Sequence, residues 1–477
     1  MDTTRRQQER AVGRATGPDR LRLFAVMWAL ASLWHLLGDP GGAPAWAQAA
    51  LALALGLVLW RPGAVVPLGL LAAAGVAVAW EEAPALGDHW LLASLVNVAI
   101  LLCIGVAVLR RRLGDRTDLA ERLFPAARLC LLGAYGFAAF AKLNSAFFDR
   151  GASCAVFLYR QTTGSIGLEG LQLGGTAWLE RAVILAVAGI QLAVPLLLLV
   201  RRTRSLGVVL AMGFHLVVAL DRTASHVESS AVLFALLVLL LPPSSGQWTA
   251  ERVGSVGARL ALRDEALPGR VRLAAVMVPT LVGLLVAVDA VDDELAFDLG
   301  WWSWQVFALV ALTSAARHLR QSPGPSAVRL LPYHALYALV PLLVVANGVA
   351  PYVELKTGDT WTTYSNLRTV DGDTNHLVLP RTLPVSEEQA DLVEILDTND
   401  PMLALYRASD LALTWDRLRA HLHDRPGVAI TYRRGSKLVA LARASDEPEL
   451  VAPLPLAQEK LLPFTPVDLA EPEPCRP

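Results

Sequence analysis

The sequence predicts an all-α multi-pass transmembrane bundle of about 11 helices, followed by a small α+β domain. Three observations predict this fold class. The chain has 477 residues, of which 54% are hydrophobic and only 18% charged, a composition typical of polytopic membrane proteins. Apolar segments recur between short polar breaks as far as residue 346. From residue 349 the chain becomes polar and rich in Pro and Asp, and it is long enough there for a small domain.

The chain begins with a polar, basic arm, residues 1–20, and the apolar run after it lacks a small-residue cleavage site. We interpret residues 21–37 as a retained first span of a transmembrane domain that extends over residues 21–348. The candidate spans are 21–37, 45–60, 65–80, 90–109, 129–148, 182–200, 206–220, 231–241, 273–288, 302–316 and 330–346. Several are shorter than the roughly 20 residues of a full crossing.

Charge in the connecting loops predicts the orientation, because Lys and Arg concentrate on the cytoplasmic side. Arg-rich loops at 61, 110–122, 201–204, 247–272 and 316–321 alternate with acidic or neutral loops at 38–44, 81–89, 221–230 and 291–298. We therefore expect a protein of a bacterial-type plasma membrane, with a cytoplasmic N-terminus and an extracytoplasmic domain over residues 349–477.

Five segments of that domain show secondary-structure patterns. Residues 374–380 and 391–396 read as strands, and residues 428–432 and 437–442 read as a hairpin closed by a Gly-containing turn. Residues 413–424 read as one amphipathic helix. This pattern predicts an α+β cap on the extracytoplasmic face.

A single cation, Lys142, lies in the apolar run 129–148. Intramembrane lysines are costly and usually face a cavity or a partner, and burial would lower the pKa of Lys142 until the neutral amine can act as a base. The alternative is a lysine whose amine reaches the headgroups. We name His89 and His215 as further catalytic candidates, and we expect His89 close enough to Lys142 to exchange a proton.

Other polar residues belong to the same predicted level of the membrane. Tyr135, Asp221 and His226 are candidate substrate-binding residues. His35 and Asp88 lie at the same predicted level but are given no role in binding. Three of the candidates have a structural alternative: a core histidine bonded to a neighbouring backbone carbonyl for His215, an ion pair with Arg222 for Asp221, and a solvated loop histidine for His226.

Cys154 and Cys475 would share the oxidising compartment, so a disulfide and two free thiols are the alternatives there. Cys103 and Cys130 lie inside spans, where they would pack as small apolar residues.

Four stretches carry a family resemblance: 87–97 (GDHWLLASLVN), 135–148 (YGFAAFAKLNSAFF), 213–242 and 358–369 (GDTWTTYSNLRT). Their order and spacing resemble the vitamin K-dependent gamma-carboxylases and the bacterial membrane proteins that share their HTTM domain, over residues 20–368. The resemblance implies that Lys142 deprotonates a vitamin K hydroquinone and that His89 assists it, while His215 falls on a family histidine. It also implies lyase-type or quinol-linked oxygenase chemistry, with a reduced quinone that arrives through the lipid bilayer. Ala141 and Asn144 depart from the pattern of the animal enzyme.

Two functions remain open at this point. One is a membrane enzyme that uses Lys142 as a base on a quinol or another lipid-soluble substrate. The other is a non-enzymatic transporter or assembly scaffold whose extracytoplasmic domain binds a protein partner. The net charge of -1 gives no basic field for nucleic acid, and without paired-cysteine spacing no metal is expected.

Overall fold

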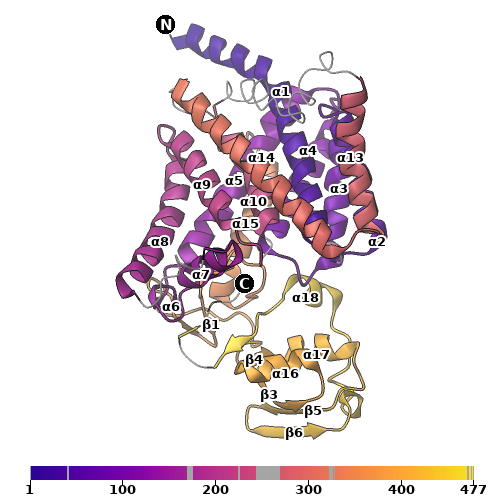
Figure 1. Cartoon of the computed structure of the whole chain (residues 1–477), viewed down its shortest axis with the longest axis vertical. Coiled ribbons are helices and arrows are strands. Elements are labelled where there is room, and N and C mark those ends of the chain that lie inside the picture. The colour runs from indigo at the N-terminus through magenta and orange to yellow at the C-terminus, as the bar shows by residue number, and fades with distance from the viewer. Residues whose placement is uncertain are drawn as a thin grey trace.

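The computed structural model describes residues 2–39, 42–168, 176–223, 226–242, 269–321, 326, 328–469, 472–473 and 475, with side chains for all of these except 2–19 and 269–272. It has two parts, a bundle of mostly long helices and a smaller C-terminal region with a sheet (Figure 1). The predicted basic loop 247–272 lies almost entirely outside the described residues.

The bundle is built from helices in which apolar side chains face one another in a single buried core. These helices are α1 (Asp2–Gly38), α2 (Ala45–Trp60), α3 (Val65–Glu82), α4 (Asp88–Leu109), α5 (Arg116–Ala141), α6 (Ser145–Phe148), α7 (Cys154–Ser165), α8 (Ala177–Leu199), α9 (Arg204–Val218), α10 (His226–Leu237), α13 (Gly269–Ala287), α14 (Asp293–Gln321) and α15 (Leu339–Val349). Short 3-10 turns follow α10 (η2, Val238–Leu240) and flank α15 (η3, Ala335–Ala338; η4, Ala350–Val353).

By length and composition, seven helices among the described residues can cross a membrane. Four shorter apolar helices accompany them, at Ala45–Trp60, Arg204–Val218, His226–Leu240 and Leu273–Ala287. Many of the large side chains on the outside of the bundle are also apolar, as expected for a surface in contact with lipid tails. The fold is therefore that of a multi-pass membrane protein.

The predicted fifth span, 129–148, is not one helix. Helix α5 begins earlier, at Arg116, and ends at Ala141, and the chain turns before α6. The cause is Asn144, whose backbone is extended (φ -136°, ψ 160°). Its side-chain oxygen accepts a hydrogen bond from the Phe147 backbone N–H (2.8 Å), and its amide donates to the carbonyl of Ala141 (2.8 Å). Asn144 thus ends one helix and starts the next, which hydropathy alone does not show.

Basic residues gather at the end of the bundle farthest from the C-terminal region. The side chains of Arg22 and Arg116 lie against the Gly63 turn, which joins α2 to α3. Arg204, which is buried, donates hydrogen bonds to the backbone carbonyls of Ser326 (2.8 Å) and Val328 (3.1 Å). Arginine-bearing connections from distant parts of the sequence therefore meet at one end.

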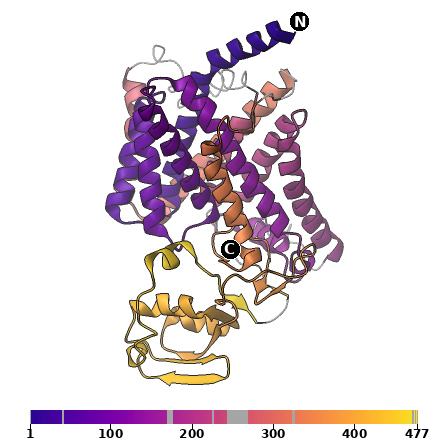
Figure 2. The same cartoon turned by 180° about the vertical axis from the view of Figure 1, so that it is seen from behind.

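The C-terminal region contains a two-stranded ribbon and a five-stranded antiparallel sheet. The ribbon pairs β1 (Thr369–Val370) with β2 (Asp373–Thr374). The sheet has the order β6-β5-β3-β4-β7 and consists of β3 (Leu392–Thr398), β4 (Leu411–Thr414), β5 (Ile430–Arg434), β6 (Lys437–Leu441) and β7 (Val467–Asp468). Helices α16 (Pro401–Ala408) and α17 (Trp415–His423) pack beside it over a separate apolar core, and α18 (Leu456–Leu461) lies next to the bundle (Figures 1 and 2).

Two expectations for this region are wrong in detail. Residues 374–380 do not form a strand beyond Thr374, because their backbone groups bond to the bundle instead of to a sheet. The segment 413–424 is not helical throughout, since β4 runs to Thr414 and α17 begins at Trp415. The hairpin lies at β5 and β6, where Gly435 has a positive φ of 57°.

Several parts of the C-terminal region are attached to the bundle. Residues 143–145 pair with residues 375–377 through backbone hydrogen bonds, such as that from Leu377 N–H to the Leu143 carbonyl (2.8 Å). Lys460 on α18 donates to the Trp80 carbonyl (2.8 Å) at the end of α3. A disulfide joins Cys154 to Cys475 across 321 residues of sequence.

Candidate functional site

A cavity of about 820 Å³ lies where the helix bundle meets the C-terminal region. Helices α4, α5, α8 and α9 form its wall on the bundle side, where apolar side chains such as Val187, Ile190 and Phe214 line it. The segment 357–370 forms the wall on the other side. A cavity of this size, mostly apolar with a few polar groups, is suited to a small organic ligand.

Lys142 lies in the wall of this cavity, one residue beyond the end of α5, and its side chain is buried. Its Nζ donates to the backbone carbonyls of Ala138 (3.3 Å) and Thr363 (3.4 Å), both long hydrogen bonds. It forms no ion pair within the part of the chain that the structure describes. Burial therefore lowers the pKa of Lys142 to about 8, a change that the nearby negative charge of Asp88 opposes.

Asp88 is the acidic neighbour of Lys142. Its carboxylate accepts hydrogen bonds from the Thr363 backbone N–H (3.2 Å) and hydroxyl (2.6 Å), while the Thr363 carbonyl accepts from Lys142. Thr363 thus contacts both groups: its N–H and hydroxyl bind the carboxylate of Asp88, and its carbonyl binds the amine of Lys142. The charge of Asp88 also acts on Asp359, because burial and Asp88 together raise the pKa of Asp359 to about 7.

His89 lines the same cavity, but it does not pair with Lys142. Its Nε2 is buried and lies 3.6 Å from a carboxylate oxygen of Glu228 on α10. Among the described contacts, no hydrogen bond joins the imidazole of His89 to the amine of Lys142. The described contacts therefore include no direct path between the two residues that we expected to exchange a proton.

Tyr135 and His215 form a second polar pair in the cavity wall. The Tyr135 hydroxyl lies 2.8 Å from His215 Nε2, and the two residues come from α5 and α9. Tyr135 and Lys142 are seven residues apart, about two helical turns, so they project from the same side of α5. The alternative of a histidine bonded to a backbone carbonyl does not describe the His215 ring, whose partner is the tyrosine hydroxyl.

Of the two other candidate residues, His226 lies in the cavity wall and Asp221 does not. Asp221 is fully buried and is not in the cavity wall; it accepts hydrogen bonds from Gln161 Nε2 (2.8 Å) and from the Thr223 backbone (2.9 Å). It does not pair with Arg222, which binds Asp298 (2.5 Å). His226 does line the cavity, and its ring packs against Tyr364 with a centroid distance of 5.2 Å.

The segment 357–370 has an unusual backbone. Four of its residues, Asp359, Trp361, Tyr364 and Asn366, have φ between 52° and 63°. Large side chains rarely adopt this left-handed conformation, so tertiary contacts must hold it. The Trp361 indole N–H, for example, donates to the Val344 carbonyl (2.9 Å).

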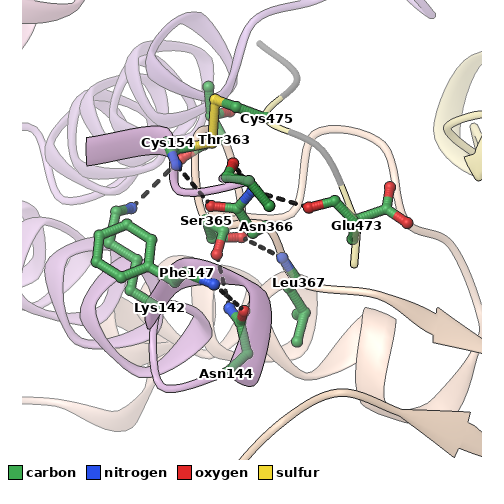
Figure 3. The surroundings of a disulfide bond; sticks show 11 residues. Lys142, Asn144, Phe147, Cys154, Thr363, Ser365, Asn366, Leu367, Glu473 and Cys475 are labelled. Atoms are coloured by element: carbon green, nitrogen blue, oxygen red, sulfur yellow. Dashed lines mark hydrogen bonds between the residues drawn. A yellow bond between two sulfur atoms is a disulfide. The ribbon is translucent and has the colours of Figure 1, made fainter. Parts of the chain in front are cut away.

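The disulfide reinforces this segment (Figure 3). Asn366 accepts a hydrogen bond from the backbone N–H of Cys154 (2.8 Å) and donates to the carbonyl of Glu473 (3.0 Å), next to Cys475. The Asn144 amide donates to the Ser365 carbonyl (2.6 Å), close to Lys142. The turn that carries Lys142 and the wall opposite it are thus fixed to each other.

A buried polar cluster lies behind His89 and was only partly foreseen. His35 Nδ1 lies 2.6 Å from Glu228 Oε2, and His35 Nε2 lies 2.8 Å from Glu82 Oε1. Sequence reasoning placed His35 at this level, but it missed both glutamates. Each is an acidic residue at the end of an apolar segment, which is the signal that could have identified them.

No known protein family, curated protein or solved structure matches this chain. Its long apolar helices define the class as a multi-pass membrane protein.

Proposed function

We propose that this protein is an integral membrane enzyme that uses Lys142 as a general base on a quinol or another lipid-soluble substrate. The observation that carries the proposal is the buried amine of Lys142 in the wall of a cavity of about 820 Å³. With a pKa of about 8, about one-tenth of the amine is neutral at pH 7 and can accept a proton.

The cavity wall fits a hydroquinone. Val187, Ile190 and Phe214 offer an apolar surface for a ring and an isoprenoid chain. Lys142 and the Tyr135–His215 pair offer polar groups for the ring oxygens. A bound quinol supplies the redox chemistry.

The amine of Lys142 takes the proton. The O–H bond of the substrate breaks, an N–H bond forms on Nζ, and the electron pair stays on the substrate oxygen. The resulting ammonium keeps two carbonyl acceptors, Ala138 and Thr363, and has the negative charge of Asp88 nearby. These groups stabilise the charge separation that deprotonation creates. Lyase-type carboxylation and quinol-linked oxygenation both begin with such a deprotonation, as the family resemblance implies.

The proposal includes an orientation. Basic connections lie at one end of the bundle, near Gly63, and the cavity lies at the other. The disulfide between Cys154 and Cys475 is beside the cavity, and disulfides persist in oxidising compartments. We therefore orient the N-terminus toward the cytoplasm and the C-terminal region away from it, in a bacterial-type plasma membrane.

The test is turnover of hydroquinones by the purified full chain in lipid nanodiscs. Menaquinol and vitamin K hydroquinone are supplied with oxygen, with and without bicarbonate, and quinone products are measured by chromatography. We expect Lys142→Met to reduce turnover at least a hundredfold, in line with loss of a general base. Lys356→Met is the matched control, because Lys356 is also buried but is not in the cavity wall. Equal activity of the two variants would remove Lys142 from the mechanism.

A second candidate function is a transporter or an assembly scaffold. The observation in its favour is that the five-stranded sheet has its own core, around Val393, Leu418 and Tyr432, apart from the cavity. Such an independently packed unit can present a surface to a partner protein. Deletion of the sheet would then abolish partner capture in cells, while Lys142→Met would have no effect on it.

A further inference from the structure

We propose that His35, His89 and Glu228 form a binding site for one divalent transition-metal ion, with Zn²⁺ as the representative ion. The ligands come from α1, α4 and α10, and α10 packs against both of the other helices. This inference does not depend on the proposed function.

The distances fit a metal site with small adjustments. One ligand atom from each of the three residues lies within 4.8 Å of the other two. Ligand atoms at ~2.1 Å from a tetrahedral zinc ion lie ~3.4 Å from one another. His89 Nε2 and Glu228 Oε2 are already 3.6 Å apart. A small movement of the Glu228 carboxylate away from His35 Nδ1, now at 2.6 Å, would complete the arrangement.

The second ring nitrogen of His35 is already oriented. His35 Nε2 lies 2.8 Å from Glu82 Oε1, so a proton on Nε2 leaves Nδ1, on the side of Glu228, free to bind a metal. Histidine ligands commonly donate their other N–H to a carboxylate in this way. The ring of Trp90 stacks on His35 with a centroid distance of 3.7 Å and an angle of 14°, which fixes the plane of the imidazole.

Charge also favours a divalent ion at this place. The carboxylates of Glu82 and Glu228 are both buried, with side-chain exposures of 6% and 5%. A divalent ion at this place would bring two positive charges close to both carboxylates, and buried charges are retained where they are paired or coordinate a metal.

The donor set selects the kind of ion. Two imidazole nitrogens and one carboxylate suit Zn²⁺, Fe²⁺ or Mn²⁺ better than Ca²⁺ or Mg²⁺, which prefer oxygen ligands. His89 is also part of the cavity wall, so the ion would lie directly behind that wall. Three protein ligands leave a coordination position for water or another ligand.

The competing explanation is an imidazolium held between two carboxylates with no metal. Purified full chain in detergent is stripped with a chelator, incubated with ZnCl₂ or CoCl₂, and freed of excess ion on a desalting column. We expect about one metal ion per chain, and with Co²⁺ the visible absorption typical of a site of four or five ligands. Less than a tenth of an ion per chain in the wild type would overturn the proposal.

Variants assign the site. Glu228→Gln and His89→Ala should each lower the metal content at least tenfold, and Glu82→Gln should weaken affinity by about 10- to 100-fold through loss of the orienting carboxylate. His215→Ala is the matched control, a histidine of the same cavity wall that lies outside the cluster. Metal content unchanged in Glu228→Gln, or lost equally in His215→Ala, would contradict the assignment.

A measurement on the wild type alone covers the case in which a variant does not fold. Diethyl pyrocarbonate modifies neutral imidazoles, and mass spectrometry reports the modified peptides. Zn²⁺ should slow modification of His89, which lines the cavity, at least tenfold and leave His215 unchanged. Equal rates at His89 with and without Zn²⁺ would refute metal binding at this cluster.

Discussion

Asp88→Asn tests whether burial makes the amine of Lys142 available as a base. The substitution removes the negative charge that opposes desolvation of Lys142, while the Asn side-chain oxygen can still accept the hydrogen bonds from Thr363. An opposite charge at close range shifts a pKa by about one unit or more. The pKa of Lys142, about 8 in the wild type, should therefore fall toward 7.

The size of the effect follows from these values. At pH 7 a lysine of pKa 8 is about one-tenth neutral, and one of pKa 7 is about one-half neutral, so the neutral population rises about fivefold. Because only the neutral amine reacts with acylating reagents, the rate of Lys142 acetylation at pH 7 should rise about fivefold. At pH 10 both proteins should react at the same rate.

The chain is well suited to this measurement, because it has only four lysines: Lys142, Lys356, Lys437 and Lys460. Trace labelling with acetic anhydride from pH 6 to pH 10, followed by mass spectrometry, gives a titration curve for each. Lys437 is exposed and serves as the internal reference. A curve for Lys142 that does not move in Asp88→Asn, or that moves to higher pH, would refute the electrostatic reasoning.

Three further predictions concern the junction between the two parts. Wild-type protein digested with trypsin should keep the fragments bearing Cys154 and Cys475 linked until reductant is added, and Cys475→Ser should abolish that linkage; identical gels with and without reductant would contradict the bridge. Asn144→Ala removes three hydrogen bonds and should cost about 2–4 kcal/mol, seen as a lower Tm in detergent, whereas an unchanged Tm would show that the turn does not depend on this side chain. The pKa of Asp359 is raised from 3.8 to about 7, so its stabilising contribution is present below pH 4 and is lost as pH rises through 7. Asp359→Asn should therefore reduce the fall in Tm between pH 5 and pH 8, and an equal fall in both proteins would contradict the raised pKa.

The helical class of the fold follows from the sequence, because long apolar segments indicate helices that are buried in lipid or in a protein core. The helix break before α6 does not, since Asn144 stands between two apolar runs and only its contacts with Ala141 and Phe147 reveal the turn. Likewise, residues 375–377 have the pattern of a strand, but their partners are residues 143–145 of the bundle.

For the candidate site, too, the sequence predicts individual residues but not their contacts. Lys142 and His89 could be named from the sequence, because charged or polar residues in apolar segments are conspicuous. Their partners could not be named, because pairing depends on which helices pack side by side: Lys142 faces Asp88 and Thr363, and His89 faces Glu228. Glu82 and Glu228 were missed because each lies in a polar loop pattern that also predicts a solvated residue.

The attachment of Cys475 and Glu473 to the lysine end of the bundle has a consequence for biogenesis. The wall opposite Lys142 is held by residues that the ribosome makes more than three hundred positions later, across the 321-residue separation of the two cysteines. Helices made earlier in synthesis therefore lack this support until Glu473 and Cys475 reach the segment that carries Cys154 and the disulfide forms. Completion of the cavity wall thus depends on segments far apart in the sequence and on an oxidant for the two thiols.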